Sequence, residues 1–326
     1  MSREQLEQQQ IAIYFMAVLA AVVGGLFAPV AGQALGVLVT PAIAVLMYAM
    51  FLQIPFLDLR QGLGNRRFLL ALLIANFIVI PVLVWLLTRG LSDYPAILVG
   101  ALLVLLTPCI DYVVVFTHLG KGDSRLTLAA TPVLLLLQLL LLPLYLALML
   151  GSESSVAISI SPFVEAFVVL IVVPLVLAVL TAAGVKRFPV VARWNNVWAW
   201  MPVPAMAGVL VVVIGSQITA VVSGLDQLLP VIPVYLAFMV LAPLTGALVA
   251  RGFRLPAAAA RSVAFSTSTR NSLVVLPLAL ALPEGIRQLA AAAVITQTLI
   301  ELVGELIYIR AIAALIRDKK QREATQ

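Results

Sequence analysis

The chain has 326 residues, of which 63% are hydrophobic and only 10% are charged, and its mean hydropathy is +1.15. Soluble domains have about 45–50% apolar and about 25% charged residues, so the composition excludes an ordinary soluble enzyme and indicates a polytopic membrane protein. The net charge of +6 is spread along the chain, so we expect no nucleic-acid partner. One cysteine and one histidine exclude an intramolecular disulfide and argue against a zinc site, so we expect no metal or cofactor.

Apolar segments long enough to cross about 30 Å of hydrocarbon at about 1.5 Å per residue occur along the whole chain. In chain order we place ten of them at residues 11–29, 33–56, 68–88, 95–118, 126–150, 162–184, 196–216, 228–250, 259–282 and 289–315. The first is not a cleaved signal peptide, because Glu4 and Glu7 stand beside Arg3 where a positive n-region would be. We therefore predict an all-α polytopic membrane protein with ten transmembrane helices.

The basic residues support this count, because Lys and Arg collect in loops on the cytoplasmic side of a membrane. With both termini inside, all but four of the 20 basic residues fall in predicted cytoplasmic segments. The exceptions are Arg89 and Arg287 in outer loops, and Arg270 and Arg310 within spans. We therefore predict a multi-pass protein of the plasma (inner) membrane with both termini cytoplasmic.

Two short polar stretches interrupt the fourth and ninth spans, at 107–111 and 267–272. A shift of the chain by 160 residues lays one stretch over the other, and an odd number of spans per repeat gives opposite orientations. Residues 1–155 and 156–326 are therefore predicted to be two inverted five-helix repeats whose broken helices 4 and 9 cross near the midplane. Because an unsatisfied backbone group in hydrocarbon costs several kcal/mol, such breaks are typical of the substrate site of a secondary transporter.

Arg270 is the most informative residue in these breaks, because a guanidinium keeps its proton and a charge at the bilayer centre costs at least ~2.5–3.5 kcal/mol. We expect it to pair with Asp111, with a glutamate of the last span or with the substrate; a purely structural ion pair is the alternative. Asp111 is either only an N-cap or a cap that also touches substrate or proton. Thr107, Thr269 and Asn271 complete the candidate substrate-binding set, although Ser and Thr often bond to a carbonyl one turn earlier.

Glu301 and Glu305 lie four residues apart and so share one face of the last span. Burial and mutual repulsion favour the binding of a proton, so the pair is a candidate proton carrier. The alternative is that one pairs with Arg270 and the other lies in a wet cavity without titrating. Cys109 is either a small buried hydrophobe or, inside the first break, a soft ligand for a thiophilic metalloid. Candidates for interhelical hydrogen bonds or cavity lining are Asn76, Gln138, Gln217 and Gln297.

The segment from Cys109 to Gly122 resembles the fourth-span motif of the arsenite-efflux permeases, which belong with the bile acid:sodium symporters and riboflavin transporters in one superfamily. The likeness extends to residues 57–60, 271–272 and 299–301. The resemblance implies a core domain of spans 3–5 and 8–10, a panel domain of spans 1, 2, 6 and 7, and substrate between them near the crossing helices. It also implies that Cys109 and Glu301 act in proton-coupled export of arsenite.

This chain departs from that pattern at two positions, since the arsenite permeases carry a small neutral residue at the place of Asp111 and no arginine at that of Arg270. In the bile acid branch, the stretch matching Ser266 to Asn271 supplies sodium ligands, so a guanidinium there implies sodium-independent transport. We therefore expect a carrier that exchanges arsenite or a related metalloid oxyacid for protons. The alternative is a sodium-independent carrier of organic anions in which Arg270 and the half-helix N-termini hold a carboxylate.

Two other function classes find little support in the residues. A nucleophile and base at Cys109 and His118 would lie about 13 Å apart on a straight helix, so an enzyme is not expected. A receptor built on a carrier fold is a remote alternative, because it would need an output domain and only residues 317–326 follow the last span. We expect the partners to be a small molecule, protons and the lipid bilayer.

Overall fold

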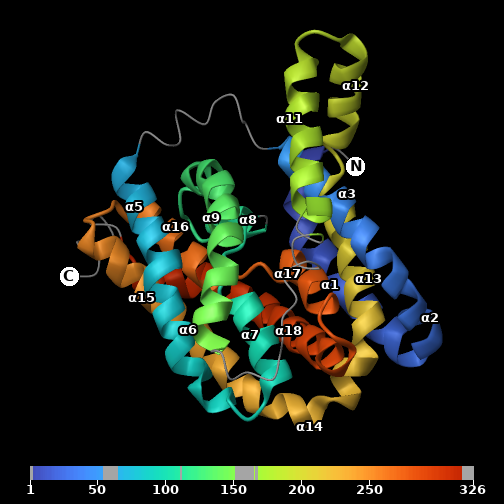
Figure 1. Ribbon diagram of the computed structural model, residues 1–326. Coiled ribbons are helices and arrows are strands. Elements are labelled where there is room, and N and C mark those ends of the chain that lie inside the picture. The colour runs from blue at the N-terminus through green and yellow to red at the C-terminus, as the bar shows by residue number, and fades with distance from the viewer. Residues whose placement is uncertain (1–2, 54–64, 111, 151–164, 166–167, 318–326) are drawn as a thin grey trace. The chain divides into compact units, whose positions relative to one another are not determined.

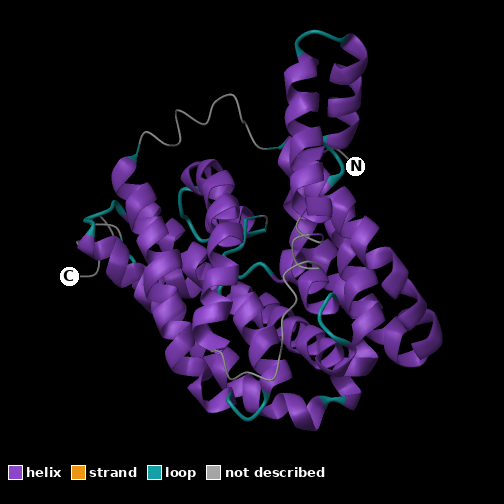
Figure 2. Ribbon diagram, viewed as in Figure 1, coloured by secondary structure: helices purple, strands orange, loops and turns teal. Residues whose placement is uncertain are grey.

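The computed structural model describes residues 3–53, 65–110, 112–150, 165 and 168–317, and these residues form helices and connecting loops with no strand among them (Figures 1 and 2). The chain divides into two compact units. The first unit comprises Met1–Phe56, Ile158–Asp226 and Leu276–Ile295, and the second comprises Leu57–Ala157, Gln227–Val275 and Thr296–Gln326. Both polar stretches, 107–111 and 267–272, belong to the second unit.

The first unit contains a chain of helices from both halves of the sequence. They are α1 (Arg3–Phe27), α2 (Pro29–Ala34), the 3-10 helix η1 (Leu35–Leu38), α3 (Val39–Leu52), the π-helix η4 (Val168–Val172), α11 (Val173–Val185), α12 (Pro189–Trp198) and α13 (Pro202–Ser223). Helices α1 and α2 approach α13 closely, because a Cβ on Gly25 or Gly32 would lie 2.7 or 2.6 Å from the carbonyl oxygen of Gly215. Only glycine fits at these two positions.

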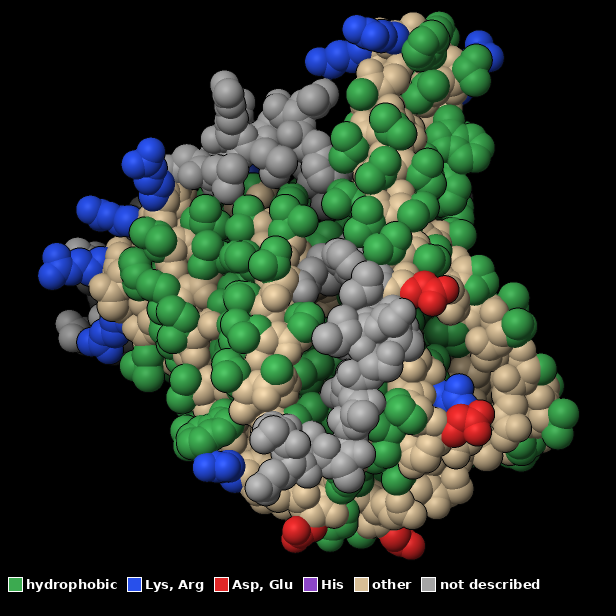
Figure 3. Space-filling model, in the orientation of Figure 1, with side chains coloured by type: hydrophobic (Ala, Val, Ile, Leu, Met, Phe, Trp, Pro, Cys, Tyr) green, Lys and Arg blue, Asp and Glu red, His purple; other side chains and the backbone are tan. Residues whose placement is uncertain are grey.

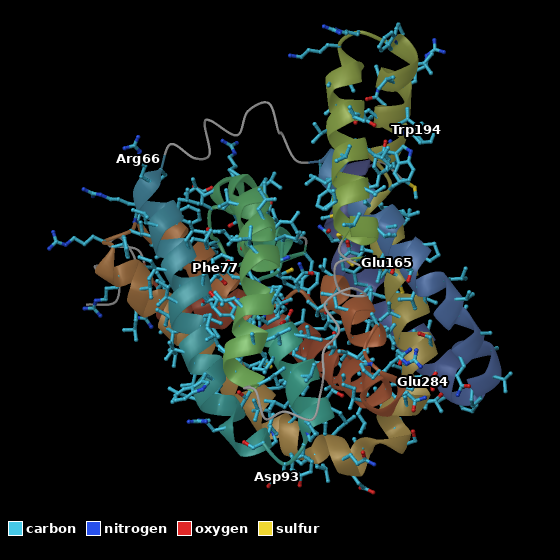
Figure 4. All side chains as sticks on the ribbon, in the orientation of Figure 1. Arg66, Phe77, Asp93, Glu165, Trp194 and Glu284 are labelled. Atoms are coloured by element: carbon cyan, nitrogen blue, oxygen red, sulfur yellow. The ribbon has the colours of Figure 1, made fainter. Side chains whose placement is uncertain are left out.

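Helices α11 and α12 lie side by side in the first unit (Figure 1). The indole Nε1 of Trp194, labelled in Figure 4, donates a hydrogen bond of 2.9 Å to the Tyr48 hydroxyl of α3. That hydroxyl lies 2.9 Å from the Thr181 hydroxyl of α11, and the Trp198 ring packs edge-on against Tyr48 at 4.7 Å between centroids. Aromatic side chains with one polar atom thus join three helices, as is common where one end of a ring is apolar and the other polar.

The second unit holds the interrupted helices. It contains α5 (Arg66–Ile74), the π-helix η2 (Ala75–Val79), α6 (Ile80–Thr88), η3 (Arg89–Leu91), α7 (Pro95–Leu105), α8 (Val113–Leu119), α9 (Ser124–Leu150), η5 (Leu229–Val231), α15 (Ile232–Gly252) and α16 (Ala257–Ser268). Helices α14 (Leu225–Leu228), α17 (Ser272–Leu280) and α18 (Glu284–Leu315) contain the residues at which the two units divide.

Local side-chain chemistry sets several helix starts in this unit. Asn65 caps α5, because its Oδ1 accepts a hydrogen bond of 3.1 Å from the Phe68 amide. Asp123 does the same for α9, where its Oδ1 accepts from the Leu126 amide at 3.1 Å. Asn and Asp are preferred at this position because their oxygens satisfy amides that lack an intrahelical partner. Helix α7 instead begins with Pro95, whose missing N–H costs nothing in the first turn.

Four helical segments among the described residues are long and apolar enough to cross a membrane. They are Pro29–Leu52, Arg66–Leu91, Pro202–Ser223 and Leu225–Gly252, and a pair within α9 that is bent by 49° would be a fifth. Shorter apolar helices cover Ala12–Phe27, Pro95–Leu105 and Val173–Val185. An all-helical, polytopic membrane protein is therefore confirmed, whereas the ten-span count, the inverted repeat and the division into panel and core domains stay predictions.

The boundaries of the seventh predicted span, 196–216, are wrong. Residues up to Trp198 belong to the separate helix α12, and α13 starts only at Pro202 and runs to Ser223. Apolar composition alone does not reveal this interruption, because Trp198 to Met201 are all hydrophobic residues.

The outer face of the second unit carries the apolar surface expected of a lipid-facing protein. Hydrophobic side chains cover much of the face drawn in Figure 3 over α5, α6 and α9. From Leu136 onward, every fourth residue of α9 is an exposed leucine. This stripe consists of Leu136, Leu140, Leu144 and Leu148, which are each 51–76% exposed. A continuous apolar stripe of this kind is unfavourable in water, and lipid is the medium that accommodates it.

Candidate functional site

The two polar stretches interrupt two helices and lie against each other. The first falls between α7, which ends at Leu105, and α8, which begins at Val113; the second falls between α16 and α17. The Cys109 amide donates a hydrogen bond of 3.0 Å to the Thr269 carbonyl, and the Asn271 amide donates one of 2.9 Å to the Thr107 carbonyl. These two bonds form an antiparallel bridge between residues 108 and 270, which we call the break bridge. Backbone groups freed from one helix are therefore satisfied by the other.

Most hydroxyls at the break bridge bond back to their own helices. Thr107 Oγ1 lies 2.9 Å from the Leu103 carbonyl oxygen, and Ser268 Oγ lies 2.6 Å from that of Ala264. Thr267 Oγ1 reaches the Ala264 carbonyl at 2.9 Å. This is the local pattern that Ser and Thr adopt in helices, and it gives Thr107 a structural explanation that needs no substrate.

Arg270 has the largest side chain among the fully buried described residues. Its guanidinium Nη2 donates to Asn76 Oδ1 at 3.0 Å and to the Ser266 carbonyl, and its Nη1 donates to the Leu105 carbonyl at 3.3 Å. The guanidinium carbon also lies 5.5 Å from the centre of the Phe238 ring, within range of a cation–π contact. The expected ion pair with a glutamate is not among the contacts of the described residues, and neutral oxygens take its place.

Asn76 holds the guanidinium from a different helix. It lies on the π-helix η2, next to Phe77, which is labelled in Figure 4. Its Nδ2 donates to the Leu72 carbonyl at 3.1 Å and to Ser266 Oγ at 3.0 Å, which leaves Oδ1 to face Arg270. All polar atoms of the amide are thus engaged, and the orientation of the amide is fixed. Single π-helical turns often mark functional positions in membrane helices.

Glu301 bonds to both sides of the break bridge from α18. Its Oε1 accepts a hydrogen bond of 2.6 Å from the Tyr112 hydroxyl, and its Oε2 accepts one of 2.9 Å from the Arg270 amide. The Gln297 Nε2, one turn earlier on α18, also donates to Oε2. The carboxylate therefore satisfies a backbone amide that the break leaves without a helical partner, and only 1% of the residue is exposed.

Glu305 bonds to the second break through Thr269. Thr269 Oγ1 lies 2.6 Å from Glu305 Oε1 and 2.8 Å from the Phe265 carbonyl oxygen. The other carboxyl oxygen, Oε2, is buried and has no hydrogen-bond partner among the described residues. The expectation that Glu301 and Glu305 share one buried helix face at the break is consistent with this arrangement, in which each carboxyl bonds to a different residue of 269–270.

Two polar atoms at the start of α17 have no partner in the described part of the chain. They are Asn271 Nδ2 and Ser272 Oγ, on residues that are each 1% exposed. Asn271 Oδ1 accepts a weak hydrogen bond of 3.4 Å from the Val274 amide and so caps α17. Buried donors without partners are uncommon in native proteins, and these two can donate to a bound ligand.

Cys109 and Asp111 complete the predicted set. Cys109 is fully buried, and its backbone amide belongs to the break bridge. Its side chain is therefore attached to the backbone where the two broken helices meet. Asp111 lies outside the described residues. The structure therefore brings Cys109, Thr107, Thr269, Arg270 and Asn271 together. Residues that the sequence did not single out for this site are Tyr112, Ser266 and the polar pair Asn76 and Gln297, which we expected only as general interhelical or cavity-lining groups.

An apolar helical protein in which two broken helices meet at buried charged residues has the features of a membrane transporter. The model of the sodium bile acid symporter family matches residues 40–224, more than half of the chain, and the chain belongs to this family. The match contains the first break and ends before the second break and α18. A search of curated proteins finds no match. The superfamily expected from the residues around Cys109 is therefore confirmed, and the arsenite branch stays a prediction.

Proposed function

We propose that the protein is a secondary active carrier that exports arsenite or a related metalloid oxyacid in exchange for protons, without sodium. The observation that supports this proposal is that Glu301 and Glu305 both bond to the break that contains Arg270, which itself pairs with the break that contains Cys109. Each carboxyl group, which would carry the proton, is thus linked by hydrogen bonds through residues 269–270 to the backbone of Cys109.

The contacts of Glu305 accommodate a proton without rearrangement. The Thr269 hydroxyl has a single proton and two oxygens within reach, the Phe265 carbonyl and Glu305 Oε1. When Glu305 carries no proton, the hydroxyl donates to the carboxylate. When Glu305 is protonated, its own O–H donates to Thr269, whose hydroxyl then donates to the Phe265 carbonyl. Both states keep every proton in a hydrogen bond, which suits a group that gains and loses a proton during transport.

Cys109 supplies the soft ligand that arsenite requires. Trivalent arsenic is thiophilic, and a cysteine sulfur is the softest ligand that a protein offers. In the proposed orientation, with both termini cytoplasmic in the inner membrane, protons entering from outside meet the carboxyl groups while arsenite leaves. Proton binding and the substrate ligand then act on the same bridge between broken helices.

Arsenite uptake into everted membrane vesicles, with and without an imposed proton gradient, tests this function. We expect gradient-dependent accumulation by the native protein, its loss in Cys109→Ala and Glu301→Gln, and no change in Glu284→Gln. Glu284 is a matched control because it lies on the same helix, with an exposed carboxyl 3.0 Å from Arg287. No accumulation by a folded native protein would rule out arsenite as the substrate.

A sodium-independent organic-anion carrier is the second candidate. The bile acid in the family name supports an organic anion as the substrate. The unpartnered donors Asn271 Nδ2 and Ser272 Oγ also support it, because they can bind a carboxylate at the start of α17. Uptake of a bile acid that falls in Asn271→Ala or Arg270→Ala and is unchanged in Cys109→Ala would favour this reading over arsenite. The opposite pattern would favour the metalloid.

A further inference from the structure

The oxygens around the Arg270 guanidinium come from three separate helices. Asn76 contributes a side-chain amide oxygen, Leu105 contributes the carbonyl of the last residue of α7, and Ser266 contributes a carbonyl from the last turn of α16. All three residues that contribute oxygens are buried, and Arg270 itself is completely inaccessible to solvent. We call these three oxygens the oxygen set.

The oxygen set has the chemistry of a cation site. Carbonyl and amide oxygens are the ligands that hard cations take in proteins. Two of the three oxygens also lie at the C-terminal ends of helices, where the aligned peptide dipoles amount to about half a negative charge. In transporters with broken helices, unwound carbonyls and half-helix C-termini coordinate the coupling cation.

A carboxyl group of α18 adds to this attraction. Glu301 bonds to the Arg270 backbone amide at 2.9 Å, so a carboxylate lies on the same residue whose side chain enters the oxygen set. A cation among these oxygens is therefore favoured both by the helix ends and by a nearby carboxyl group. The arginine side chain carries one positive charge, which equals the charge of one monovalent cation.

We propose that the Arg270 guanidinium takes the place of a dissociable monovalent cation, so that the oxygen set of Asn76, Leu105 and Ser266 is a cation site permanently filled by the protein itself. Removal of the side chain then opens the site, and the protein becomes one that binds sodium. The inference concerns the cation and does not depend on which substrate the carrier moves.

The test uses the full-length protein purified in detergent and measures its melting temperature in sodium chloride and in choline chloride at equal ionic strength. The native protein is expected to melt at the same temperature in both salts. Arg270→Ala is expected to melt at a higher temperature in sodium, with a shift that saturates as sodium rises, because a ligand that binds only the folded state stabilises it.

Three further variants assign the shift to the oxygen set. Arg270→Lys keeps a tethered positive charge and is expected to show no sodium shift. Arg270→Ala combined with Asn76→Leu lacks one of the oxygens and is expected to lose the shift. Arg287→Ala removes a partly exposed positive charge elsewhere on the chain and is expected to behave as the native protein does, which controls for the change in net charge.

Several results would overturn the proposal. One is the absence of a sodium shift in Arg270→Ala; another is an equal shift in the native protein; a third is a shift that survives the loss of Asn76. If Arg270→Ala does not fold when purified in choline, purification in sodium is expected to restore a monodisperse protein, and equal loss in both salts would contradict the inference. Because the readout is binding and not transport, it stands whether or not arsenite proves to be the substrate.

Discussion

Helix α15 packs against α16 just before the second break, and Gly246 lies at a close contact between the two helices. A Cβ built on Gly246 would overlap Thr267 Oγ1 and lie 2.9 Å from the Ala264 Cα. Thr267 Oγ1 cannot simply turn away, because it bonds the carbonyl oxygens of Ala242 and Ala264 at 3.1 and 2.9 Å. A Gly246→Ala substitution must therefore break these bonds or displace the backbone of α16, two residues before the break bridge.

Two other glycines allow the cost to be separated from helix propensity. Gly208 lies within α13 with no atom within 4 Å of a built Cβ, so Gly208→Ala reports the propensity gain alone, about 1 kcal/mol. At Gly304 the Cβ would meet mainly the terminal methyl of Met239, the far end of a flexible side chain that can move. Overpacking of a rigid core costs about 1–3 kcal/mol, so Gly246→Ala should be less stable than Gly208→Ala by that amount, with Gly304→Ala between them.

Thermal unfolding of the three variants in one detergent and lipid mixture measures this order. The same preparations, reconstituted for transport, show whether displacement of α16 also disturbs the break bridge. Stabilities of Gly246→Ala and Gly208→Ala that agree within about 0.5 kcal/mol, the usual precision of additivity between distant sites, would refute the reasoning. The contact at Thr267 would then not be what positions the second break.

Three side chains of the site give further tests by thermal unfolding and by gradient-driven uptake. Tyr112→Phe removes the donor to Glu301 Oε1 and should cost about 1.5–3 kcal/mol, as expected for a hydrogen bond to a charged group, with reduced uptake. Asn76→Leu removes an acceptor from the buried guanidinium and should cost about 1–3 kcal/mol, because a donor is left without a partner. Thr269→Val removes the hydroxyl between Glu305 and the Phe265 carbonyl. It should cost only about 0.5–1.5 kcal/mol of stability while reducing proton-driven uptake strongly. Uptake that falls only as far as the amount of folded protein falls would contradict a role in proton binding.

The positions of the two breaks could be predicted because hydrocarbon penalises polar interruptions so strongly. Residues 107–111 and 267–272 stood out against long apolar surroundings, and the helices end and begin beside them as predicted. The start of α13 could not be predicted in the same way. Hydrophobic residues continue across the gap between α12 and α13, so composition does not reveal where one helix ends and the next begins.

The partners of Arg270 could not be predicted, because the sequence shows which side chains carry a formal charge but not where backbone carbonyls with partial negative charges lie in space. We expected Asp111, a glutamate of the last span or the substrate to face the guanidinium, and Glu301 does approach this residue, but through the backbone amide. Among the described residues, which do not include Asp111, the guanidinium bonds a carbonyl at the end of α7, one in the last turn of α16 and the amide oxygen of Asn76. Which helix end accepts a bond from a cation can be predicted only when the position of that end and its neighbours are known, and this requires the fold.

Residue 270 therefore carries two opposite electrostatic interactions at one point of the chain. Its amide, freed by the break, bonds a carboxyl group of α18, while its side chain bonds the carbonyl ends of two broken helices. A break in a membrane helix exposes both kinds of backbone group at once, and each needs a partner of opposite polarity. Here one arginine and one glutamate satisfy both, and the carboxyl group holds the amide while neutral oxygens hold the guanidinium. If the carrier is proton-coupled as we propose, this separation lets Glu301 take up a proton while the guanidinium keeps its contacts with the broken helices.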